Sequence, residues 1–130
     1  MKITYKGDYA LKALFQLALR YDEGEMGVMA QHSPMIVLLR GGTIRLYEGG
    51  QVTERLFVTG GFAEVTPTRV TVLANEATPV AGVSRAEGET RLAAAQAEYE
   101  RADKNDVPAL DALMDRMQSA RAMIEAAQAA

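Results

Sequence analysis

The sequence predicts an α+β protein, an antiparallel β-sandwich or barrel followed by an antiparallel two-helix hairpin. Two changes near residue 83 of the 130-residue chain predict this division. Before it the chain is rich in Val, Thr, Gly and large aliphatic residues, and after it in Ala, Glu, Arg and Gln. The charge changes as well, from 8 basic and 8 acidic side chains up to residue 82 to 6 basic and 9 acidic ones beyond it. We therefore expect an N-terminal segment (1–24), a β-sandwich module (25–82) and a helical hairpin (83–130).

Short apolar runs separated by glycine predict the strands of the β module. Residues 35–39 form a continuous apolar run that suits a strand buried on both faces, and Gly41–Gly42 is expected to end it. Residues 43–48 alternate with the period of a half-buried strand, and Gly49–Gly50 is a two-residue hairpin signal. Five or six strands at this spacing predict a sandwich or barrel. The expected strands cover residues 35–39, 43–48, 52–58, 62–65 and 69–73.

Helix-start signals predict the hairpin. Ser84 and Glu87 fit a capping box, so a helix is expected from there to about residue 102. Asp106 can cap a second helix, with Pro108 tolerated in its first turn. The short link predicts antiparallel helices. The expected contact stripes are Leu92, Ala95, Tyr99 and Ala102 on the first helix, and Leu110, Leu113, Met117, Ala120, Ile124 and Ala127 on the second.

These stripes are narrow and rich in alanine, so they bury little apolar area. The hairpin is therefore expected to be marginal by itself and to lean on the β module or on a partner. Two interpretations of the hairpin stay open, a mobile arm and a plain stabilising element.

The N-terminal segment carries two patterns. Residues 10–19 contain strong helix formers at helical spacing, whereas residues 15–21 also alternate with the period of a strand. Composition favours a helix over residues 10–21.

The composition excludes most catalytic and metal chemistry. There is no Cys and only one His, so neither a thiolate nucleophile nor a multi-histidine or cysteine metal site is expected. The paired glycines match neither a P-loop nor a dinucleotide fingerprint, and Asp22, Glu23 and Glu25 lack EF-hand spacing. His32 is expected in a turn or an interface. We therefore expect no catalytic residue, no metal and no cofactor, hence a binding or structural module.

Composition also limits the partners and the location. No basic face is expected, so no nucleic acid partner is predicted. No apolar run reaches 18 residues and no signal-peptide pattern is present, so we expect an intracellular protein without membrane insertion.

Several motifs resemble the epsilon subunit of F-type ATP synthases. They are E-G-E-M-G-V-M-A-Q-H-S-P over residues 23–34, G-T-I-R-L-Y-E-G-G over 42–50, F-V-T-G-G-F-A-E-V-T-P over 57–67 and V-T-V-L-A over 70–74. The resemblance covers about residues 23–130, and its helical hairpin matches too. It implies a ten-stranded sandwich with two helices, a non-catalytic part of the central stalk at the cytoplasmic face of the membrane.

The same resemblance implies partners. The sandwich is expected to bind the gamma subunit and the polar loops of the c-ring, with Glu25 and His32 near the c-ring contact. The hairpin is expected to extend and inhibit ATP hydrolysis. The family's Pro-Gly before the histidine is replaced by Ala30–Gln31, and the I/L-D-x-x-R-A pattern of ATP-binding members is absent.

The first 24 residues resemble another family. M-K-I-T-Y-K-G-D-Y-A-L-K-A-L over residues 1–14, continuing through residues 21–24, resembles the opening of IscR-like winged-helix repressors. The recognition helix that should follow is absent, so DNA binding is not carried over. A chimera joined near residues 22–25 and a divergent natural epsilon subunit both stay open. So do a DNA-binding regulator, a recombined fold without a cellular role, and self-association through an uncovered sheet edge.

Overall fold

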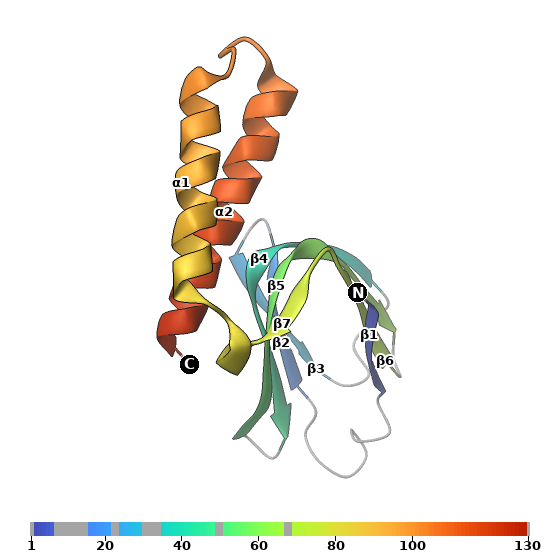
Figure 1. The fold of residues 1–130 in the computed structure, drawn as a ribbon. Coiled ribbons are helices and arrows are strands. Elements are labelled where there is room, and N and C mark those ends of the chain that lie inside the picture. The colour runs from blue at the N-terminus through green and yellow to red at the C-terminus, as the bar shows by residue number, and fades with distance from the viewer. Residues whose placement is uncertain are drawn as a thin grey trace.

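The computed structural model describes residues 2–6, 16–21, 24–29, 35–48, 51–66 and 69–129. They form one curved sheet of seven strands and two long helices that stand beside it (Figure 1). The strands are β1 Lys2–Lys6, β2 Gln16–Tyr21, β3 Gly24–Met29, β4 Met35–Glu48, β5 Gln51–Thr66, β6 Arg69–Ala74 and β7 Ala77–Pro79. A 3₁₀ turn, η2 Val80–Gly82, leads into α1 Arg85–Arg101 and α2 Val107–Ala129.

All the strand pairings described are antiparallel, in the order β1-β6-β5-β4-β2-β3, with β7 paired to β5. The predicted fold class, a β-sandwich followed by a two-helix hairpin, is confirmed. Its core lies inside the curve of the sheet. The buried side chains there are Val37, Leu39, Ile44, Leu46, Leu56, Val58, Ala63, Val70, Val72 and Ala74.

The two longest strands run through the glycine pairs. The prediction that Gly41–Gly42 ends a strand is wrong, because β4 continues through them and pairs with β5 on both sides. In β5, Gly60 and Gly61 have φ values of 137° and 128°, which favour glycine. A Cβ at Gly61 would overlap the carbonyl oxygen of Leu73 on β6. Both glycine pairs therefore lie within long strands and do not end them.

The N-terminal residues that are described belong to the same sheet. β1 pairs with β6, and β2 lies between β3 and β4. The helix favoured for residues 10–21 is therefore wrong for Gln16–Tyr21, where pairing on both sides outweighs local helix propensity. Residues 7–15 lie outside the described part of the chain.

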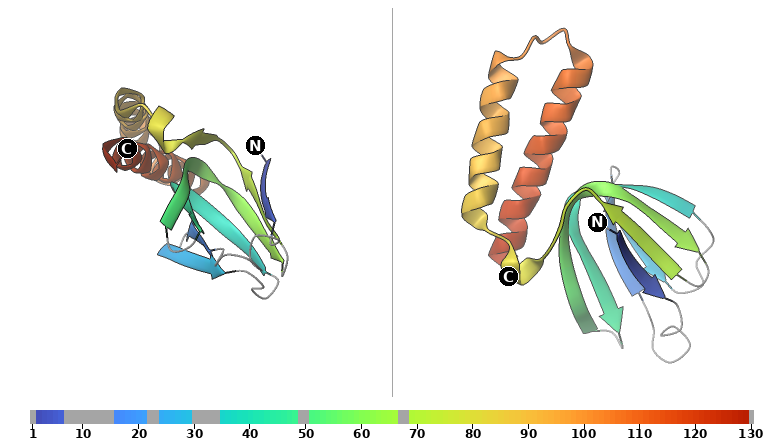
Figure 2. Two further views of the ribbon diagram at one scale, coloured as in Figure 1. Left: turned by 90° about the horizontal axis from the view of Figure 1, so that it is seen from below. Right: turned by 45° about the vertical axis from the view of Figure 1, so that its right-hand side comes forward.

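The hairpin follows its predicted caps. The Ser84 hydroxyl accepts from the Glu87 amide at 3.1 Å and the Asp106 carboxylate from the Ala109 amide at 3.2 Å. Leu113 and Ala120 of the predicted α2 stripe are buried. The linking turn points away from the sheet, whereas the C-terminal part of α2 lies beside it (Figure 2).

Candidate functional site

The sheet and the hairpin meet along the C-terminal half of α2, and we call this contact the hairpin joint. Its apolar part is a cluster of buried side chains, separate from the core of the sheet. These are Phe57 from β5, Val80 from η2, and Ala122, Met123 and Ala126 from α2. The expectation that the hairpin leans on the β module is therefore confirmed.

The polar part of the hairpin joint consists of short contacts to the backbone of the sheet. Gln118 donates to the carbonyl oxygen of Gly41 at 2.6 Å and accepts from its amide at 3.0 Å. Ser119 donates to the carbonyl oxygen of Thr59 at 2.9 Å. A Cβ at Gly41 would lie 2.5 Å from Ser119 Oγ, so α2 can come this close only because residue 41 is a glycine.

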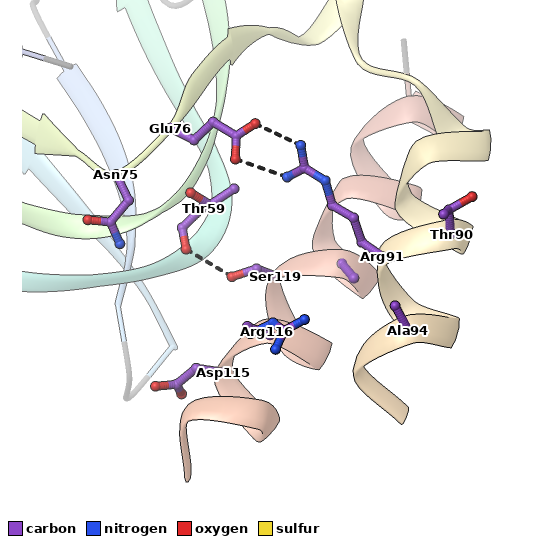
Figure 3. Close-up of a pocket in the computed structure, with 10 residues that line it drawn as sticks. Thr59, Asn75, Glu76, Thr90, Arg91, Ala94, Asp115, Arg116 and Ser119 are labelled. Atoms are coloured by element: carbon purple, nitrogen blue, oxygen red, sulfur yellow. Dashed lines mark hydrogen bonds and ion pairs between the residues drawn. The ribbon is translucent and has the colours of Figure 1, made fainter. Parts of the chain in front are cut away.

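An adjoining cleft of about 510 Å³, the Arg91 cleft, lies between the sheet and both helices (Figure 3). Arg91 of α1 donates to both carboxylate oxygens of Glu76, at 2.8 and 2.9 Å, and to Glu87 at 2.6 Å. The Arg91 hydrogen bonds hold the pKa of Glu76 below its ordinary value, while partial burial opposes this. The same carboxylates raise the pKa of Arg91. This ion pair fixes α1 to the segment between β6 and β7.

A second ion pair joins the two helices. Arg116 of α2 donates to Glu98 of α1 at 2.8 Å, and this hydrogen bond holds the pKa of Glu98 below its ordinary value. Because both arginines of the Arg91 cleft are already paired with carboxylates, the cleft is built to hold elements together.

A second cleft, of about 360 Å³, adjoins the Arg91 cleft and shares Thr59, Asn75, Asp115 and Ser119 with it, and we call it the Arg40 cleft. Arg40 belongs to β4 and lies opposite Gly60 of β5. Across the cleft, α2 contributes Asp115, Gln118 and Ser119.

The outer face of the sheet carries an exposed apolar patch of four residues, Ile36, Leu38, Phe62 and Leu73. Ile36 is 77%, Leu38 62% and Phe62 43% exposed. Leu38, Phe62 and Leu73 are register partners on three neighbouring strands, so their side chains lie side by side on one face. Leu38 and Phe62 also line the Arg40 cleft. A contiguous exposed apolar patch of this kind marks an interaction surface.

The described residues hold neither a metal-binding group nor a membrane-spanning helix. None of them form a group of three or more His, Asp or Glu side chains that would hold a metal ion. Neither described helix is long and apolar enough to cross a membrane.

The two predicted interface residues are only partly placed. Glu25 lies in β3 opposite Arg20 of β2, whereas His32 lies outside the described residues. The sequence patterns missed Gln118, Arg91 and Arg40. Gln118 meets Gly41 from 77 positions away, so no local pattern could have indicated it.

Known proteins resemble this chain in both sequence and structure. The family described as "ATP synthase, Delta/Epsilon chain, beta-sandwich domain" matches residues 11–80. The ATP synthase epsilon chain of Granulibacter bethesdensis is 63% identical over 106 residues, which are 82% of this chain and 78% of that protein. The epsilon chain of Gluconacetobacter diazotrophicus is 51% identical over 105 residues, 81% of this chain and 74% of that one.

Among solved structures, a chain of the Euglena gracilis mitochondrial ATP synthase OSCP/F1/c-ring assembly matches with a TM-score of 0.68. It is 26% identical, and the match covers 87% of this chain and 69% of that chain. The family match begins at residue 11 and so includes β2, upstream of the junction expected near residues 22–25.

Proposed function

This chain belongs to the ATP synthase delta/epsilon chain family, and on that premise we propose that it acts as the epsilon subunit of an F-type ATP synthase. The observation that carries this is 63% identity to an epsilon chain over 106 residues, which span most of both proteins. Such a subunit is not itself an enzyme. It is an accessory part of the central stalk that takes part in coupling and regulating ATP synthesis and hydrolysis.

Reconstitution tests this function. The chain is added to the bacterial enzyme from which its own epsilon subunit has been removed, and ATP-driven proton pumping is measured. We expect proton pumping to be restored. Unchanged pumping together with no retention of the chain on the enzyme would contradict the proposal.

The partner proposed for the sandwich is the gamma subunit, and the exposed apolar patch is the surface proposed to meet it. Phe62→Ser should weaken binding to purified gamma by about tenfold or more, because a central aromatic side chain of an interface carries much of the binding energy. Val107→Ser is the matched control, since Val107 is 59% exposed but lies on α2, outside the patch. Equal effects of the two variants would argue against the patch.

The c-ring is the second proposed partner, through Glu25 and His32. This proposal rests on the family resemblance of residues 23–34 and on the OSCP/F1/c-ring assembly that contains the Euglena gracilis relative. Glu25→Lys should reduce proton pumping in the reconstituted enzyme while binding to isolated gamma stays intact. Undiminished pumping with Glu25→Lys would remove Glu25 from this interface.

The hairpin is proposed to act as a regulatory arm that leaves the hairpin joint to inhibit ATP hydrolysis. The small size of the hairpin joint supports it, because release breaks one small apolar cluster, the contacts of Gln118 and Ser119 and the Glu76–Arg91 ion pair, and leaves the core of the sheet intact. The chain has no cysteine, so spin labels can be attached to cysteines introduced at Asn105 and Glu54. Gln118→Ala should increase the population with a long distance between the labels. An unchanged distance distribution would contradict a releasable arm.

The proposed location is the cytoplasmic face of the bacterial plasma membrane, where the chain would be held by its partners. Fractionation of cells tests this, with retention on membranes expected only when the ATP synthase is present.

The origin of residues 1–24 is a separate proposal. Their resemblance to IscR-like repressors supports a chimera in which foreign residues supply β1, whereas the family match from residue 11 includes β2. We propose the division into residues 1–24, 25–82 and 83–130 from this resemblance and from the change in composition and charge near residue 83. The test is to sequence the natural reading frame upstream of Glu23. If it encodes epsilon-like strands that differ from residues 1–22, a chimera is supported. If it encodes residues 1–22 as they stand in this chain, a chimera is contradicted.

A further inference from the structure

Glu64 lies inside the exposed apolar patch. It is the register partner of Ile36 on β4 and of Thr71 on β6, and all three are on the outer face of the sheet. Phe62, two positions earlier on β5, shares this face because side chains alternate along a strand. Glu64 is therefore the middle residue of a row that runs directly beside the apolar row through Phe62.

The Glu64 side chain has no partner within the part of the chain that the structure describes. It is exposed and forms neither a hydrogen bond nor an ion pair there. Its two cross-strand neighbours, Ile36 and Thr71, carry no charge. Arg69 is on the same face, but it stands opposite Thr66, one step further along the sheet. In the free chain the exposed carboxylate of Glu64 is therefore hydrated.

A partner cannot cover the exposed apolar patch without covering Glu64. The patch extends from Ile36 on β4 to Leu73 on β6, and β5 lies between these strands, with Glu64 on the same face. A segment that contacts both ends of the patch therefore crosses the Glu64 side chain and takes it out of water. Burial of an ionised carboxylate is strongly unfavourable unless a positive charge and hydrogen-bond donors replace the water. The partner has to supply both.

The described basic side chains near the patch lie at its border. Lys2 of β1 is exposed and is the register partner of Leu73, and Arg69 is exposed two positions before Thr71 on β6. Charges at the rim of an interface keep their contact with water and contribute little to binding. Glu64, inside the patch, therefore sets the charge that the centre of a partner surface has to carry.

We propose that the segment of gamma that covers the exposed apolar patch carries a lysine or an arginine that binds the Glu64 carboxylate. Glu64 thereby becomes a specificity-determining residue, because a segment with an apolar or acidic side chain at that point leaves the carboxylate buried without a partner. The pair also fixes the register of the two surfaces, since it forms in only one placement of gamma on the sheet. This inference rests on the proposed function, because it assumes that gamma covers the patch.

The test is the binding of full-length variants to purified gamma, measured by calorimetry. Glu64→Gln keeps the size of the side chain and removes its charge. It should weaken binding by about tenfold or more, since the basic side chain of gamma is left without its partner. Glu64→Lys should weaken binding by about a hundredfold or more, because it places two like charges together. Circular dichroism and thermal melting show that each variant is folded.

Glu54→Gln is the matched control. Glu54 is an exposed glutamate of the same strand, but it is the register partner of Leu46 and lies outside the patch. This variant makes the same change in net charge as Glu64→Gln and should bind gamma within about twofold of the parent chain.

A charge exchange identifies the residue of gamma that binds Glu64. The lysines and arginines of gamma are replaced by glutamate one at a time, and each gamma variant is titrated with the parent chain and with Glu64→Lys. One replacement should weaken binding to the parent chain and restore binding to Glu64→Lys to within about tenfold of the parent pair. A pair between Glu64 and a basic residue of its own chain cannot produce this exchange.

The outcomes separate the two proposals. If Phe62→Ser weakens binding to gamma but Glu64→Gln does not, only this inference is overturned. If Glu64→Gln and Glu54→Gln weaken binding equally, net charge explains the loss and the inference is overturned as well. The same holds if no replacement in gamma restores binding to Glu64→Lys. If the parent chain does not bind gamma at all, the proposed function fails, and the inference fails with it.

Discussion

Gly41 is the residue at which the sheet comes closest to α2. A methyl group there would lie 2.5 Å from Ser119 Oγ and 2.6 Å from Ser119 Cα, so Gly41→Ala forces α2 away from the sheet. We expect a loss of about 1–3 kcal/mol in the free energy of unfolding, the usual cost of overpacking. Urea denaturation measures it. Gly82→Ala is the control, because a Cβ there meets only Thr78 Cγ2 at 3.7 Å, and a similar loss in both variants would contradict this account.

The Glu76–Arg91 pair makes part of the hairpin's attachment dependent on pH. Arg91 holds the pKa of Glu76 in the folded chain below its ordinary value. The pair therefore stabilises the fold fully at a pH above the ordinary pKa, and this stabilisation is lost as the pH falls through the folded pKa. The two side chains are 47% and 36% exposed, which limits the contribution to about 0–1 kcal/mol.

Glu76→Gln should therefore lower the free energy of unfolding by up to about 1 kcal/mol at pH 7. The difference from the parent chain should shrink from about pH 5 downward, as the Glu76 carboxylate becomes protonated in the parent chain. Urea denaturation at pH 7, 5 and 3 measures it. Glu125→Gln, an exposed position of α2 without a described ion pair, should show no such trend, and a constant difference for Glu76→Gln would refute the prediction.

At the scale of the element, α2 has two apolar faces with different partners. Leu113 and Ala120 lie on the predicted stripe, whereas Met123 belongs to the cluster that faces the sheet and is 4% exposed. Met123→Ala should cost about 2–5 kcal/mol, because it leaves a cavity in the hairpin joint. Met114→Ala, at a position 53% exposed on the same helix, should change stability by less than about 0.5 kcal/mol. Thermal and urea unfolding compare them, and equal losses would show that the joint contributes little.

The sequence predicted the helices better than their attachment to the sheet. Spacing identified the caps at Ser84 and Asp106, because a cap and its amide lie three residues apart. The sheet-facing side of α2 was missed because two of its three residues in the buried cluster, Ala122 and Ala126, are alanines, which are common at any helical position. Alanine becomes informative only once a partner surface is known.

The sequence predicted those strands that show a local pattern of alternating residues. It failed where pairing with neighbouring strands determines the structure. Gln16–Tyr21 has the alternation of a strand but also strong helix formers, and pairing with β3 on one side and β4 on the other decides for the strand. Gly41–Gly42 suggested a strand end because glycine disfavours strands, yet pairing with β5 continues β4 through both residues. The Arg40 and Arg91 clefts could not be predicted, since each combines residues from elements that only the tertiary fold brings together.

At the scale of the whole molecule, two separate apolar clusters stabilise the fold, one within the sheet and one between the sheet and α2. The sheet has its own core, in which Ile44 and Val72 are at most 2% exposed, and this cluster contains no residue of either helix. The apolar cluster of the hairpin joint is smaller, and Phe57 is its one residue from the described strands of the sheet. The arrangement suits a body that stays folded while an arm changes position.

Deleting residues 84–130 tests this division. We expect the remaining β module to stay folded and to melt cooperatively, because the core of the sheet is complete without the hairpin. Its melting temperature should fall, since Phe57, 1% exposed in the intact chain, loses its cover from α2. Far-ultraviolet circular dichroism and calorimetry measure both. Loss of the cooperative melt would show instead that the hairpin completes a single core.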